Sequence, residues 1–128
     1  MPKKRALFYA FCEISGLDLP GAKGGDDLGP SALELAVMAL SGCISTIFAI
    51  IAKNSGLTYH KFVCEVEADK PDNAPTITAA RAHVYVESNE GEDKVRRILD
   101  KTMHACPVGQ LYEKAGIEIG TELEVKPL

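Results

Sequence analysis

SALELAVMALSGCISTIFAIIA, residues 31–52, is the stretch that decides the fold of this 128-residue chain. Ser31 is followed three residues later by Glu34, the spacing of a capping box, so the sequence predicts that a helix begins here. The helix should run to about Lys53 and end before Gly56, which can adopt the left-handed conformation that closes many helices. Almost every residue between is apolar or small, which predicts a helix buried on all sides, with Cys43 at its middle.

An apolar helix of this length also fits a membrane span, because about twenty apolar residues cross a bilayer. Polar and small residues interrupt the run between Ser41 and Thr46, and basic residues do not gather on one flank as the orientation rule for membrane helices requires. We therefore expect a helix enclosed by a sheet, by other helices and by a second subunit, and no membrane.

The composition is that of an ordinary globular domain, with 46% hydrophobic and 25% charged residues. We expect one domain, residues 1–128. The formal net charge of −4, without a basic cluster, argues against nucleic acid as the main partner. No targeting signal is convincing at the N-terminus, since Glu13 closes a short apolar run and no cleavage site follows, so we expect a cytoplasmic protein.

The remaining chain alternates between strand and helix patterns. Residues 5–14 are apolar without a helical period and predict a first strand, and period-two alternation at 57–69 and 76–87 predicts an antiparallel hairpin. Asn89, with Glu92 three residues on, predicts the cap of a second, amphipathic helix. Pro107 is typical of the first turn of a further short helix ending near Gly116, and a final strand covers 117–125. The fold class is therefore α+β, built around one buried helix.

The four cysteines are widely spaced and form no C-x-x-C pair, so each is a small hydrophobe, a ligand or a reactive thiol. Cys106 precedes a helix N-terminus, where unpaired amides lower the pKa of a thiol. Alternatively, it caps a tight turn. Cys43 alone, within an apolar helix, is typical of inert core. Cys12 and Cys64 lie in strand patterns, and we interpret both as core.

Two motifs give these cysteines a context: Gly29-Pro-Ser-Ala-Leu-Glu-Leu followed by Ala39-Leu-Ser-Gly-Cys43, and His104-Ala-Cys106-Pro-Val-Gly109. Together they resemble the OsmC/Ohr family, the osmotically inducible and organic-hydroperoxide-resistance proteins. The order of elements is similar over nearly the whole chain. The resemblance implies an intertwined α+β homodimer, with antiparallel sheets around long central helices and two thiol sites near the interface.

The resemblance also implies a chemistry, that of a thiol-dependent peroxidase without metal or cofactor. Cys43 would attack an organic hydroperoxide, and Cys106 would resolve the sulfenic acid to a disulfide, which a dithiol, lipoyl-linked in some members, then reduces. A thiolate does attack the peroxide bond, and a neighbouring thiol condenses with the sulfenic acid before it oxidises further. An apolar pocket for the substrate's tail would have walls from residues near Cys43, which alternatively are core: Leu40, Ile44, Ile47 and Phe48.

The sequence departs from the peroxidase branch of the family in its activating pair. That branch uses an arginine from the early loops, whereas here Arg5 precedes the first apolar run. By elimination, Arg81, Arg96 or Arg97 from either subunit could serve, or alternatively each is a solvated surface residue. Glu34 stands one residue nearer the cysteine than its counterpart, and the capping box accounts for it. The departures leave open a non-enzymatic redox sensor or a protein that binds a small apolar ligand. A metal site of Cys43, Cys106 and His104 lacks the fourth ligand of structural zinc.

Overall fold

The computed structural model describes residues 4–5 and 30–128 of the chain. Three helices and four strands lie in these ranges: β1 (Lys4–Arg5), α2 (Ala32–Asn54), β2 (Lys61–Asp69), β3 (Ala79–Glu87), α3 (Glu92–Ala105), α4 (Pro107–Lys114) and β4 (Ile119–Lys126). The α+β class, the long helix and the hairpin are confirmed. Apart from Arg5, the strand expected at 5–14 lies outside the described residues.

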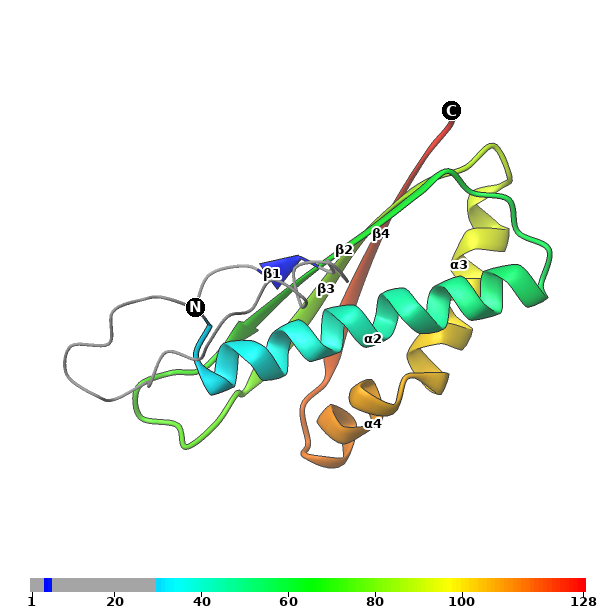
Figure 1. Cartoon of the computed structure of the whole chain (residues 1–128). Helices are drawn as coiled ribbons and strands as arrows, with labels where there is room; N and C mark the ends of the chain where they lie inside the picture. Colours follow the sequence, from blue (N-terminus) through cyan, green and yellow to red (C-terminus); the bar gives the residue numbers. More distant parts are fainter. Residues whose placement is uncertain (1–3, 6–29) are drawn as a thin grey trace.

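The four strands form one sheet in the order β1-β2-β3-β4 (Figure 1). β1 and β2 run antiparallel, and so do β2 and β3, which pair from Lys61 opposite Glu87 to Asp69 opposite Ala79. β4 instead runs parallel to β3, so the expectation of purely antiparallel sheets is wrong for this pair. The reason is the connection, because α3 and α4 lie between β3 and β4 and supply the long crossover that a parallel pair needs.

Helix α2 begins and ends where its local sequence dictates. The Ser31 hydroxyl accepts a hydrogen bond from the Glu34 amide at 3.1 Å, and the Glu34 carboxylate accepts one from the Ser31 amide at 3.3 Å. Both halves of the capping box are therefore formed. At the other end, Gly56 has a φ of 70°, the left-handed conformation expected after the last turn.

One side of α2 forms the centre of the core. The sheet, α3 and α4 all contact it (Figure 1), and its buried residues follow a helical period: Val37, Leu40, Ser41, Ile44, Phe48 and Ala52. The ring of Phe48 stacks on Phe62 of β2 with centroids 4.3 Å apart. This packing anchors the helix to the sheet.

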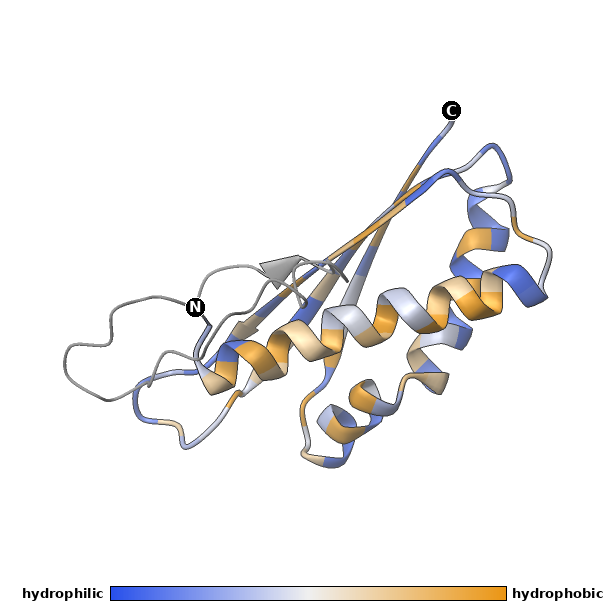
Figure 2. Cartoon of the chain, in the orientation of Figure 1, coloured by the Kyte–Doolittle hydropathy of each residue, from blue (hydrophilic) through white to orange (hydrophobic). Residues whose placement is uncertain are grey.

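The other side of α2 is apolar and is only partly buried in the described single chain, so the enclosure by a second subunit that the sequence predicts stays a prediction. Figure 2 shows hydrophobic residues along the whole helix, yet Ile50 is 50% exposed. By length and composition α2 could cross a membrane, a property that core helices of soluble proteins share. Residues 4–5 and 30–128 supply a sheet and two helices for one side only, and a further surface is needed for the rest.

Helix α3 begins differently from its sequence prediction. Its N-cap is Gly91 and makes no side-chain capping bond. Asn89 instead accepts a hydrogen bond from the amide of Leu128 at 2.9 Å. Its side chain therefore bonds to a residue distant in the sequence and does not make the helix cap that the local pattern had predicted. The short helix after Pro107 forms as expected, with Cys106 as its N-cap and Pro107 in its first turn.

Candidate functional site

Cys43 and Cys106 come together where α2 meets the start of α4. Their side chains lie close enough to interact, and this contact with Cys43 contributes to raising the pKa of the Cys106 thiol. The structure therefore brings together the two cysteines that lie 63 positions apart in the sequence.

Burial, and not the helix terminus, dominates the ionisation of Cys106. Its sulfur accepts the Gly109 amide at 3.3 Å, as expected at the N-terminus of α4, and this contact lowers the pKa. However, Cys106 is 0% exposed, and burial raises the pKa of its thiol by more. The expectation of a lowered pKa at Cys106 is therefore wrong, because the desolvation of a buried anion exceeds the attraction of the helix amides.

Cys43 is the more accessible member of the pair. It lies at the middle of α2, half-buried, and packs beside the hydrophobic core. Part of Cys43 is exposed, whereas Cys106 is 0% exposed. The two thiols thus differ in access.

Cys64 is a third thiol near this pair, and the sequence analysis placed it only in the core. It is 0% exposed on β2, and burial raises its pKa to about 12, with a further contribution from Cys106 close by. A thiol held neutral in this way is a poor nucleophile. Cys64 is accordingly a core residue, as expected. Cys12 lies outside the described residues.

The expected apolar pocket around Cys43 does not form from the residues named for it. Leu40, Ile44 and Phe48 are each 0% exposed and belong to the core between α2 and the sheet. Ile47 alone of the four remains half-buried beside Cys43 on the helix. Three of the four residues therefore belong to the core, the alternative that the sequence left open.

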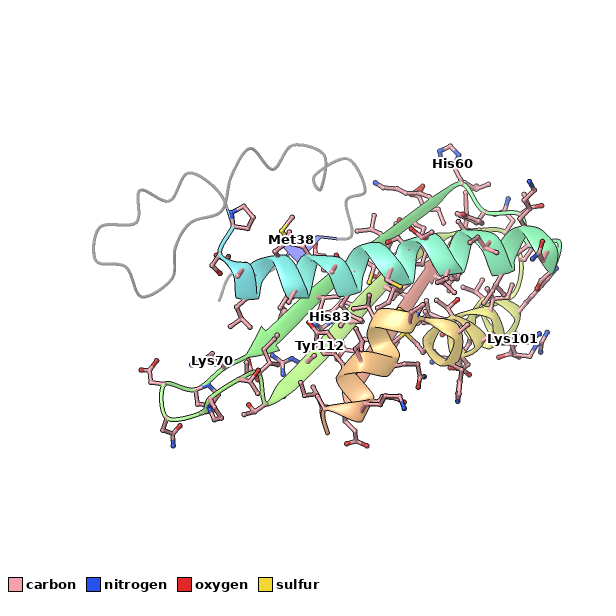
Figure 3. The ribbon with its side chains drawn as sticks, turned by 60° about the horizontal axis from the view of Figure 1, so that its bottom comes forward. Met38, His60, Lys70, His83, Lys101 and Tyr112 are labelled. Carbon is pink, nitrogen blue, oxygen red and sulfur yellow. The ribbon has the colours of Figure 1, made fainter. Side chains whose placement is uncertain are left out.

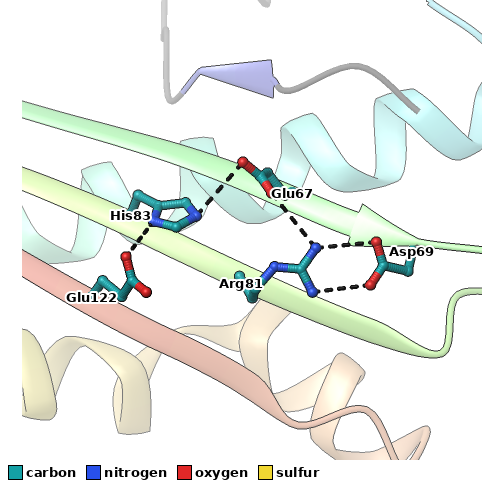
Figure 4. Close-up of polar contacts among 5 residues, drawn as sticks. All are labelled: Glu67, Asp69, Arg81, His83 and Glu122. Atoms are coloured by element: carbon teal, nitrogen blue, oxygen red, sulfur yellow. Dashed lines mark hydrogen bonds and ion pairs between the residues drawn. The ribbon is translucent and has the colours of Figure 1, made fainter.

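None of the described arginine side chains supports Cys43. Arg81 lies on the opposite face of the sheet, where its guanidinium pairs with Asp69 at 3.0 and 3.1 Å and with Glu67 at 3.6 Å (Figure 4). The same polar network continues from His83 to Glu122. Arg96 and Arg97 are exposed on α3, and Arg96 pairs with Glu92.

His104 does not join the two thiols. It is exposed near the end of α3, and its Nδ1 lies 2.8 Å from the carbonyl oxygen of Asp100. Within residues 4–5 and 30–128, no three His, Cys, Asp or Glu side chains are arranged to hold a metal ion. The site is therefore a pair of thiols, and the metal site of Cys43, Cys106 and His104 has no support in the described structure.

A family model described as OsmC-like protein matches residues 24–122, a span that contains both cysteines and every described element from α2 to α4. The chain belongs to the OsmC-like family. No significant match to a curated protein was found.

Solved structures share the fold of this OsmC-like protein at low sequence identity. The OsmC-like protein of Mycoplasma pneumoniae is 16% identical, with a TM-score of 0.72 over 77% of this chain and 73% of its own. An organic hydroperoxide resistance protein OsmC of Legionella pneumophila is 13% identical, with a TM-score of 0.63 over 86% and 79%. The organic hydroperoxide resistance protein OhrB of Bacillus subtilis is 14% identical, with a TM-score of 0.59 over 83% and 78%.

The burial of Cys64 predicts a dependence of stability on pH. Because folding raises the pKa of this thiol to about 12, from about 8.5 in an unfolded chain, its contribution is complete below pH 8.5 and is lost as the pH rises towards 12. In that window, the difference in unfolding free energy between wild type and Cys64→Ala should fall by about 1.4 kcal/mol per pH unit. Urea unfolding under a reductant, from pH 7 to 10.5, measures it. A difference that stays constant across this range would contradict the burial argument.

Proposed function

We propose that this OsmC-like protein is a thiol-dependent peroxidase that reduces organic hydroperoxides. The observation that carries the proposal is the contact between a half-buried thiol, Cys43, and a buried one, Cys106. Relatives of the same fold are named organic hydroperoxide resistance proteins, which supports the same substrate class.

The order of the steps follows from the access of the two thiols. The thiolate of Cys43 attacks one peroxide oxygen, the O–O bond breaks, and the alkoxide leaves and takes up a proton to become an alcohol. Cys43 is then a sulfenic acid, and the Cys106 sulfur attacks it, forming a disulfide and releasing water. The attack on peroxide oxidises Cys43 by two electrons, and the condensation shares this oxidation with Cys106.

A dithiol from outside the protein completes the cycle. One of its sulfurs attacks the Cys43–Cys106 disulfide, its second sulfur then releases the mixed disulfide, and both protein thiols are regenerated. The more exposed sulfur, that of Cys43, is the one that the reductant can reach. The reaction needs neither metal nor cofactor, and we assign it to the reducing cytoplasm, where free thiols such as those described here persist.

The arginine contacts favour a second candidate, a redox sensor or a binder of small apolar molecules without efficient turnover. Arg81 is held by carboxylates on the far face of the sheet, and Arg96 and Arg97 face solvent. A cation that promotes attack by Cys43 would have to come from elsewhere. Turnover distinguishes the two candidates, because a sensor consumes about one equivalent of hydroperoxide and stops, whereas a peroxidase continues while a dithiol is present.

Peroxide treatment of two single variants tests the roles of the thiols. In Cys106→Ser the resolving thiol is absent, so Cys43 should accumulate as sulfinic acid, which mass spectrometry detects. In Cys43→Ser neither sulfenic acid nor disulfide should form, and turnover of cumene hydroperoxide with dihydrolipoamide should be abolished. Sulfinic acid on Cys106 in Cys43→Ser would show that Cys106 is the attacking thiol and Cys43 the resolving one. No oxidation of either cysteine in the two variants would exclude the proposed peroxidase function.

We also propose that two subunits pair through the uncovered side of α2. The exposed or half-buried residues there recur at alternating spacings of three and four, as in the seam between two packed helices: Ala36, Ala39, Cys43, Thr46 and Ile50. A second copy of this surface would cover the apolar strip and enclose the approach to Cys43.

Light scattering tests this pairing. The wild-type protein at micromolar concentration should have twice the mass of one 13.8 kDa chain. Ile50→Glu should shift the mass towards one chain, because it buries a charge in the proposed seam, whereas Leu111→Glu on α4, also at an exposed apolar position, should not. A wild-type monomer would overturn the proposed dimer.

A further inference from the structure

Helix α4 touches α2 at a second place besides the thiol pair. The hydroxyl of Tyr112 donates a hydrogen bond to the carbonyl oxygen of Ala36 at 3.0 Å, joining residues 76 positions apart. Ala36 precedes Cys43 by seven residues, so the two lie on the same side of α2, two turns and about 10 Å apart. α4 is therefore held to α2 at both of its ends, by Cys106 at its start and by Tyr112 near its last turn.

Tyr112 is suited to this role by its burial. The side chain is part of the core, with the residue 8% exposed, and burial raises the pKa of its hydroxyl. The hydroxyl therefore keeps its proton and remains a donor at neutral pH. Figure 3 shows Tyr112 on the side of α2 where α4 lies, whereas Met38 extends from the opposite side.

The position of α4 depends on such contacts because the helix has only eight residues. Isolated helices of this length are unstable in water, and tertiary packing must hold them. Disulfide formation is sensitive to the position of this helix, since the Cα atoms of a bridged pair must lie about 4.4–6.8 Å apart. Cys106 can meet the geometry only if its helix stays docked on α2.

We propose that Tyr112 is a positioning residue for the resolving step, holding α4 so that the Cys106 sulfur stays within reach of oxidised Cys43. This inference rests on the proposed function and extends it. Tyr112 touches neither substrate nor the reacting sulfurs. It favours the resolving step, in which the Cys106 sulfur attacks the Cys43 sulfenic acid, the S–O bond breaks and water leaves. The competing step is the oxidation of the sulfenic acid by a second hydroperoxide.

Tyr112→Phe tests the inference, because it keeps the ring in the core and removes only the donor. Tyr85→Phe is the matched control, since the Tyr85 hydroxyl donates to Glu87 at 3.1 Å from the opposite face of the sheet. Each protein, reduced and held well below its melting temperature, is treated with increasing cumene hydroperoxide. Mass spectrometry then gives the ratio of Cys43 sulfinic acid to Cys43–Cys106 disulfide. A parallel series uses diamide, which joins nearby thiols without any peroxidase chemistry.

In Tyr112→Phe we expect half of the subunits to reach sulfinic acid at about one-fifth of the wild-type hydroperoxide concentration, the factor equivalent to one ordinary hydrogen bond. Diamide should form the disulfide about fivefold more slowly, and Tyr85→Phe should match wild type in both series. Wild-type behaviour of Tyr112→Phe in both series would overturn the inference. If wild type forms the disulfide with diamide but not with hydroperoxide, the proposed peroxidase function is wrong. A slower diamide reaction in Tyr112→Phe would in that case still support the positioning role.

Discussion

The structure depends on the burial of one apolar helix that carries a thiol. α2 is too apolar to face water, and the described residues cover one side of it with β1 and β2 of the sheet, α3 and α4. Phe48 and Phe62 fix the helix to the sheet. The same packing that stabilises the fold leaves Cys43 only half-buried.

Desolvation distinguishes the two thiols. The N-terminus of α4 favours an anion at Cys106, but such helix-terminus effects amount to about 0.3–2 kcal/mol. Burial can shift the pKa of a fully buried group by several units, each equivalent to about 1.4 kcal/mol. The Cys106 thiol, its pKa raised first by burial, therefore stays protonated beside Cys43. A buried, protonated thiol next to a half-buried one suits the resolving role that we propose for Cys106.

Local sequence signals predicted the parts of the fold that local interactions determine. The capping box at Ser31 and the Cys106-Pro107 helix start were correct because each is complete within a few residues. Asn89 was misassigned because its partner, Leu128, lies 39 positions away. The parallel direction of β4 and the burial of Cys106 likewise arise from packing between distant segments.

The site was predicted only where motif and chemistry coincide. Cys43 and Cys106 were named from their motifs, and the structure places them in contact. The walls of the pocket were not predicted correctly, because Leu40 and its neighbours are core residues. A helix that is apolar all round gives no sign of which side is covered. The contact of Tyr112 with Ala36 was missed as well, since nothing in the sequence around Tyr112 identifies a hydroxyl that bonds to a backbone carbonyl of another helix.

Counting the thiols consumed by one equivalent of an organic hydroperoxide tests the central claim most directly. The reduced wild-type protein is mixed with equimolar cumene hydroperoxide, its remaining thiols are titrated under denaturing conditions, and its disulfides are mapped. The account predicts that two of the four thiols per subunit disappear, with Cys43 joined to Cys106 and with Cys12 and Cys64 still free. Retention of all four thiols, or a disulfide that omits either Cys43 or Cys106, would contradict it.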